Sequence, residues 1–144
     1  MATIPEGNRK LLTYHDSWAY FAQQYGMEVI GAVQPSNFSQ PSSREVAALI
    51  DQVKDLDLPA VFGSEVFPSD VLESIANEAD AEFIDDLADD DLPGQPGDFE
   101  HTYLGLMKKN MELMIPALGG DADAISVIDI GNVFDGNSGA VYPQ

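Results

Sequence analysis

Three side chains that could bind a metal ion or move a proton each follow a predicted strand. They are His15, Glu65 and Asp85. The runs that precede them are apolar and rich in β-branched or aromatic residues, as buried strands are, and cover residues 11–14, 60–63 and 81–84. Open α/β sheets bind ligands at the edge where parallel strands have their carboxyl ends. We therefore expect the three side chains to share that edge.

The elements that must position these residues alternate along the chain. Strands are predicted at residues 11–14, 28–33, 60–63 and 81–84, and helices at 16–25, 44–56, 69–79 and 98–118. Asp16 is expected to cap the first helix and Gly26 to close it, and Ser42 with Glu45 forms a capping box. The alternation predicts an α/β fold: a single three-layer αβα domain with a four-stranded, mainly parallel sheet.

Length and composition set further bounds. The chain has 144 residues, of which 44% are hydrophobic, so it can bury the core of one domain. We assign residues 1–120 to that domain and 121–144 to a tail, with a strand expected at 125–130 and a hairpin at 133–142. We expect no membrane span, because no apolar run is long enough. We also expect no signal peptide, because the first residues lack a basic start and an apolar stretch.

The net charge of the chain limits the classes of molecule that it can be expected to bind. The net charge is −19, and no Lys or Arg occurs between Lys54 and Lys108. We therefore expect neither nucleic acid nor an anionic membrane surface as a partner, because binding to both depends on clustered basic residues. A cation is electrostatically favoured, although a solvated acidic surface explains most of this charge. Because the chain has no cysteine, any metal must bind through nitrogen and oxygen.

Five motifs in order resemble one protein family. They are T-Y-H-D-S-W-x-Y-F at 13–21, Q-P-S at 40–42, F-x-x-E at 62–65, D-D-L at 85–87 and T-Y-L-x-x-M-x-x-N at 102–110. This pattern, from about Leu11 to Leu118, resembles the carboxyl-terminal lobe of the zinc- and manganese-binding solute receptors of ABC importers.

The resemblance implies a transport role without catalysis. In that family two α/β lobes hold one metal ion between them and present it to an ABC permease outside the cytoplasm. Carried onto this sequence, the resemblance gives His15 and Asp85 as ligands of Zn²⁺ or Mn²⁺, with Glu65 near the site. A histidine at the position of His15 favours zinc over manganese. Localisation would be periplasmic or otherwise extracytoplasmic.

The sequence also departs from the family pattern. The first lobe with its two histidines and the helix that joins the lobes have no counterpart here, so this chain resembles half of a receptor. Asp86 stands where Ser or Thr usually follows the ligand aspartate, and either carboxylate could bind the ion. The missing ligands would come from another lobe, water or a second copy of the chain in a homodimer.

Other interpretations of the same residues remain open at this stage. His15 could be a structural histidine, or the general base of a small α/β metal-assisted hydrolase with Glu65 or Asp85 orienting it. The sequence contains no nucleophile elbow, P-loop or H-E-x-x-H motif to support an enzyme. A receiver-like domain would require a lysine after a later strand, whereas Lys108 and Lys109 fall in a predicted helix. His101 is expected to be exposed, and Met107, Met111 and Met114 to be core residues.

Overall fold

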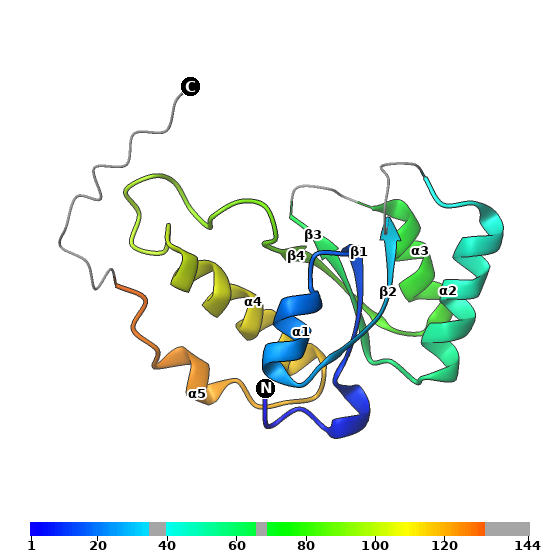
Figure 1. Ribbon diagram of the computed structural model, residues 1–144, viewed down its shortest axis with the longest axis horizontal. Helices are drawn as coiled ribbons and strands as arrows, with labels where there is room; N and C mark the ends of the chain where they lie inside the picture. Colours follow the sequence, from blue (N-terminus) through cyan, green and yellow to red (C-terminus); the bar gives the residue numbers. More distant parts are fainter. Residues whose placement is uncertain (35–39, 66–68, 132–144) are drawn as a thin grey trace.

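A computed structural model describes residues 1–34, 40–65 and 69–131 of the chain (Figure 1). Strands and helices alternate in it as the sequence predicts. The strands are β1 (Lys10–His15), β2 (Glu28–Gln34), β3 (Ala60–Ser64) and β4 (Glu82–Leu87). The helices are η1 (Glu6–Asn8), α1 (Ala19–Tyr25), α2 (Ser43–Asp55), α3 (Asp70–Ala79), α4 (Tyr103–Ala117) and α5 (Asp123–Ser126). Within the described residues, no helix has the length and apolar character required to cross a membrane.

The four strands form one sheet in the order β2-β1-β3-β4, and every paired strand is parallel. Helices α2 and α3 cover one face of the sheet, and α1 and α4 cover the other, so that the domain has three layers (Figure 1). This arrangement confirms the predicted α/β class and its parallel sheet. Because all strands run the same way, their carboxyl ends meet at one edge.

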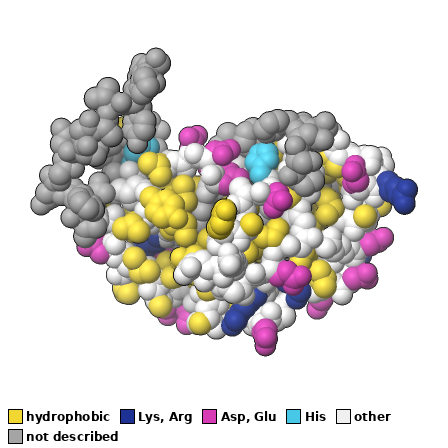
Figure 2. Space-filling view, in the orientation of Figure 1, with side chains coloured by type: hydrophobic (Ala, Val, Ile, Leu, Met, Phe, Trp, Pro, Cys, Tyr) yellow, Lys and Arg dark blue, Asp and Glu magenta, His cyan; other side chains and the backbone are white. Residues whose placement is uncertain are grey.

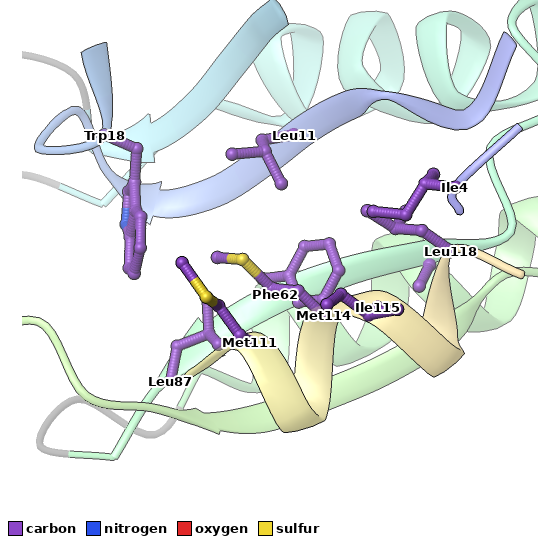
Figure 3. Close-up of a cluster of buried hydrophobic side chains, with 10 residues drawn as sticks. Ile4, Leu11, Trp18, Phe62, Leu87, Met111, Met114, Ile115 and Leu118 are labelled. Atoms are coloured by element: carbon purple, nitrogen blue, oxygen red, sulfur yellow. The ribbon is translucent and has the colours of Figure 1, made fainter. Parts of the chain in front are cut away.

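Each face of the sheet has its own hydrophobic core. Val53 of α2 and Leu72 of α3 pack with Leu12 and Val61 on one side. On the other side, α4 directs its apolar side chains at β1, β3 and β4, as Figure 3 shows for Met111, Met114, Ile115 and Leu118 beside Leu11, Phe62 and Leu87. The prediction that the methionines belong to the core is therefore confirmed for Met111 and Met114, which are buried.

The helix ends confirm some local predictions and correct others. Ser42 caps α2 in a full capping box with Glu45, and Gly26 closes α1 in the left-handed conformation, with φ 66°. Asp16 does not cap α1: the helix begins later, after Trp18, without a side-chain cap. Pro116 lies inside the last turn of α4, where it removes one backbone N–H from the hydrogen bonds of the helix.

The chain after α4 turns back over the domain. Thr3 Oγ1 donates to the carbonyl of Asp121, and Asn8 Nδ2 donates to that of Leu118, at 2.9 and 3.1 Å. The strand predicted over residues 125–130 was wrong: a short helix, α5, occupies 123–126, and no strand follows it up to residue 131. Alternating small and apolar residues there resemble a strand. The hairpin predicted at 133–142 lies outside the described residues.

Candidate metal-binding edge

The carboxyl-end edge of the sheet brings together the strand ends that carry the predicted site residues. Thr13 pairs with Phe62, and Phe62 with Ile84, so β1, β3 and β4 are aligned at this level. His15 therefore lies about level with Ser64, the last residue of β3. Because β3 lies between them, β1 and β4 are about 10 Å apart across the sheet.

His15 is the last residue of β1 and is half-buried. Its ring packs edge-to-face against Tyr14, with 4.6 Å between the ring centroids. Its backbone carbonyl accepts a hydrogen bond from Thr13 Oγ1 at 2.7 Å. The imidazole is thus held at the rim by rigid strand neighbours, which suits a ligand that must not reorganise on binding.

Asp85 and Asp86 lie within β4, which continues to Leu87 instead of ending before Asp85 as predicted. Phe62 pairs with Ile84 and Ser64 with Leu87, so two aspartates lie opposite the single residue Gly63. This extra residue is a β-bulge, a device that redirects side chains and is common beside functional sites.

The two aspartates differ in their partners. The Asp86 carboxylate forms an ion pair with Lys109 of α4, with Oδ2 and Nζ 3.0 Å apart. Asp85 is exposed, and among the described residues its carboxylate has no hydrogen-bond or ion-pair partner. Of the two carboxylates, that of Asp85 is therefore the one available to bind a cation.

Glu65 lies directly after β3 with its carboxyl group turned inward. Its Oε1 is buried without a hydrogen-bond partner among the described residues. Burial raises the pKa of this carboxyl, and the nearby negative charge of Asp89 adds to the effect, although backbone N–H groups that bind the carboxylate oppose it. Ser64 Oγ bridges the two acids, 2.8 Å from Asp89 Oδ1 and 3.5 Å from Glu65 Oε2.

Asn110 of α4 fixes the start of the loop that follows β4. Its Oδ1 accepts from the Ala88 N–H at 2.9 Å, and its Nδ2 donates to the Ala88 carbonyl at 2.7 Å. Both residues are fully buried or nearly so. This amide therefore replaces a neighbouring strand as the partner of the Ala88 backbone and sets where the adjacent aspartates lie.

Sequence reasoning missed Asp89 and the role of Asn110. Asp89 opens a run of three aspartates that has the composition of a solvated loop, and nothing in the sequence separates it from Asp90 and Asp91. The signal for Asn110 was available, since an asparagine on the apolar face of a helix requires partners for its amide. His101, expected to be exposed, is half-buried, and its Nδ1 lies 3.1 Å from the Pro93 carbonyl.

The candidate ligands at this edge are fewer than a metal site needs. In residues 1–34, 40–65 and 69–131, no three His, Asp or Glu side chains lie close enough together to hold one ion. A zinc site needs three or four ligands at about 2 Å. An imidazole from β1 and a carboxylate from β4 would provide two of them.

Comparisons with known proteins identify the family of the chain. The profile of a family described as ZnuA, zinc-uptake complex component A periplasmic, matches residues 1–117. The manganese-binding lipoprotein MntA of Bacillus subtilis is 33% identical over 122 residues, which are 82% of this chain and 40% of the relative. The zinc-binding protein TroA of Treponema pallidum is 29% identical over 120 residues, 81% of this chain and 39% of the relative.

A solved structure of a zinc-binding protein also matches the chain. The periplasmic zinc-binding protein TroA from Treponema pallidum superimposes with a TM-score of 0.71 at 29% identity, covering 81% of this chain and 44% of that structure. This chain therefore spans about two fifths of the length of the relatives that it matches.

Proposed function

Because this chain belongs to the family of zinc-uptake complex component A, we propose that it is one metal-binding lobe of a solute receptor that delivers Zn²⁺ or Mn²⁺ to an ABC importer. The family consists of metal-binding transport receptors, so the proposal assigns no reaction to the chain. The metal is its cargo. On this proposal the lobe works outside the cytoplasm, in contact with a permease.

The observation that carries the proposal is the arrangement of His15 and Asp85 at the carboxyl-end edge. His15 ends β1, and the bulge in β4 presents Asp85 without a competing cation, whereas Lys109 engages Asp86. An imidazole nitrogen and a carboxylate oxygen suit first-row transition metals, and the imidazole favours zinc over manganese. Glu65 and Asp86 are the neighbouring acids, and we assign them supporting roles.

The remaining ligands would come from outside this lobe. Since the chain covers about two fifths of its relatives' length, a second lobe is the natural source. A second copy of the chain facing the first would also complete a site of two histidines and two aspartates. If so, zinc should convert monomers to dimers in light scattering; an unchanged monomer at saturating zinc would exclude the homodimer without touching the ligand assignment.

Zinc titration calorimetry tests the ligand assignment. We expect His15→Ala and Asp85→Ala each to weaken zinc binding at least about tenfold, because each removes one of few ligands. His101→Ala is the matched control, since it removes the other histidine of the chain, which lies against Pro93. Equal affinity for wild type and His15→Ala, or an equal loss in His101→Ala, would contradict the proposal.

A further inference from the structure

Two successive residues of α4 contact the end of β4, where the candidate ligand Asp85 lies. Lys109 forms an ion pair with Asp86, with 3.0 Å between Nζ and Oδ2. Asn110 binds both the N–H and the carbonyl of Ala88. The positive charge of Lys109 therefore lies beside the two aspartates of the β-bulge, next to the carboxylate that we assign to the metal ion.

Positive charge is rare at this edge of the sheet. The chain has six Lys and Arg residues, and among the described residues Lys109 is the only one of them that forms an ion pair with an acid of the sheet. In the view of Figure 2, acidic side chains gather around a histidine near the top of the molecule, and the Lys and Arg side chains in view lie away from them. Lys109 is therefore a local exception in acidic surroundings, and its charge acts on any cation that binds beside it.

The ion pair opposes metal binding by Asp86 in two ways. First, it occupies Asp86 Oδ2, so this carboxylate must give up a partner before it can coordinate an ion. Second, the ammonium of Lys109 repels an incoming divalent cation. Both effects are modest, because the Lys109 side chain is 32% exposed and that of Asp86 56% exposed, and solvent weakens such pairs. They are still large enough to decide between two neighbouring carboxylates.

The two candidate cargo ions differ in what they would gain from a free Asp86. Zn²⁺ forms four-coordinate sites in which histidine nitrogen is a common ligand. Mn²⁺ is better suited by oxygen ligands, such as carboxylates, carbonyls and water. A second carboxylate next to Asp85 would therefore add more to the binding of Mn²⁺ than to the binding of Zn²⁺.

We propose that Lys109 is a selectivity residue of the metal site. By holding Asp86, it leaves Asp85 as the carboxylate that binds the ion, and it disfavours Mn²⁺ relative to Zn²⁺. Lys109 itself touches no metal ion and acts through Asp86. The inference rests on the proposed function, because it takes His15 and Asp85 as the ligands that this lobe provides.

Metal titration of the full chain tests this inference, with Mn²⁺ followed by electron paramagnetic resonance and Zn²⁺ by calorimetry. Lys109→Met keeps an unbranched side chain and removes its charge. It should tighten Mn²⁺ binding at least about fivefold and Zn²⁺ binding only about twofold, and Lys109→Gln should do the same. Lys108→Met is the matched control, because it removes the same charge one residue earlier, where Nζ donates to the carbonyls of Ser126 and Ile128. It should change both affinities less than about twofold.

Asp86→Asn shows whether the gain comes from this carboxylate. Alone it should leave both affinities within about twofold of wild type, because Asp86 is held by Lys109. Added to Lys109→Met, it should cancel the tighter binding of Mn²⁺. The visible spectrum of bound Co²⁺ reports the ligand set independently of affinity. It should change in Lys109→Met and return to that of wild type in the double variant.

Three results would overturn this inference and leave the proposed function intact, provided that Asp85→Ala still weakens zinc binding. One is unchanged Mn²⁺ affinity in a Lys109→Met variant that urea unfolding shows to be folded. Another is an equal gain in Lys108→Met and Lys109→Met, which would be an effect of net charge. The third is a loss of affinity in Asp86→Asn as large as that in Asp85→Ala, which would make Asp86 a ligand despite Lys109. Equal zinc affinity of wild type and Asp85→Ala would overturn the proposed function and this inference with it.

Discussion

The two faces of the sheet are built differently. On the α2/α3 face, both helices begin at a serine cap, Ser42 and Ser69, and apolar side chains of both helices pack on the sheet. On the α1/α4 face, α1 has no side-chain cap, α4 contains Pro116, and a buried asparagine holds the backbone of the β4–α4 loop. A groove lined by Tyr20, Phe21 and Tyr25 of α1 and by Tyr103 of α4 also lies on this face.

This difference distinguishes the α2/α3 face, which supports the fold, from the α1/α4 face, which we associate with function. On the α2/α3 face, local preferences for caps and apolar periodicity agree with the packed structure, which makes a rigid support. On the α1/α4 face, a long-range contact is added to these local preferences: Asn110 binds the backbone directly after the strand that carries Asp85. Proteins tolerate such local conflicts where function requires them, so the contrast can be tested by paired substitutions on the two faces.

The largest effect is expected for Asn110→Ala on the α1/α4 face. It leaves the buried N–H and carbonyl of Ala88 without partners, which should cost about 2–4 kcal/mol of unfolding free energy. Gln52→Ala is the matched change on the other face, because Gln52 Nε2 makes one bond, to the Ile30 carbonyl at 2.9 Å. It should cost about 1 kcal/mol. Urea unfolding of both variants measures the difference, and an equal cost would contradict the contrast.

A second pair compares glycines on the two faces. A Cβ at Gly105, in the first turn of α4, would lie 2.0 Å from the carbonyl oxygen of Glu100, so Gly105→Ala must displace the backbone before the helix. We expect it to cost about 1–3 kcal/mol. At Gly31 in β2 the nearest atom, 3.3 Å away, is the flexible end of Leu49. Gly31→Ala should change stability by less than about 1 kcal/mol, and a larger loss there than at Gly105 would refute this comparison.

A third pair tests the helix starts. Ser42→Ala removes the cap of α2, where Ser42 Oγ accepts from the Glu45 N–H, and should cost about 1 kcal/mol in urea unfolding. It should also raise the pKa of Glu45, which hydrogen bonds from Ser42 hold below its usual value. Asp16→Ala should change stability by less than about 0.5 kcal/mol, because Asp16 does not cap α1. A loss of 1 kcal/mol or more in Asp16→Ala would show that this residue stabilises α1 by another route.

The same contrast explains how much of the molecule the sequence predicts. The four strands, the capping box at Ser42 and the left-handed Gly26 follow from local patterns, and the parallel sheet follows from their alternation. The continuation of β4 past Asp85 does not, because it depends on the pairing of Leu87 with Ser64 of β3. It also depends on Asn110, which binds the backbone of Ala88 directly after the strand, 22 positions away in the chain. The same applies to the pairing of Ser64 with Asp89, which depends on the tertiary structure of the loop.

The smallest effect is expected for Glu65→Gln, read as a dependence on pH. Burial, with a contribution from Asp89, raises the pKa of Glu65 above its ordinary value of 4.5. The folded state therefore holds this proton more tightly than the unfolded state, and ionising Glu65 lowers stability as pH rises from about 4.5 through the folded-state pKa. The glutamine side chain stays neutral at every pH. The stability of the Glu65→Gln variant relative to wild type should therefore increase modestly over that interval and be constant below it.

Urea unfolding at pH 4, 5, 6 and 7 measures this difference, with Glu82→Gln, at an exposed position of β4, as the matched control. If the difference in unfolding free energy between wild type and Glu65→Gln is the same at all four pH values, the pKa of Glu65 does not differ between the folded and unfolded states. A loss of stability in Glu65→Gln at pH 7 would have a different cause. The favourable interaction of the carboxylate with the backbone N–H groups of Glu65, Asp89 and Asp91, which lowers the pKa of Glu65, would then outweigh the cost of burying its charge.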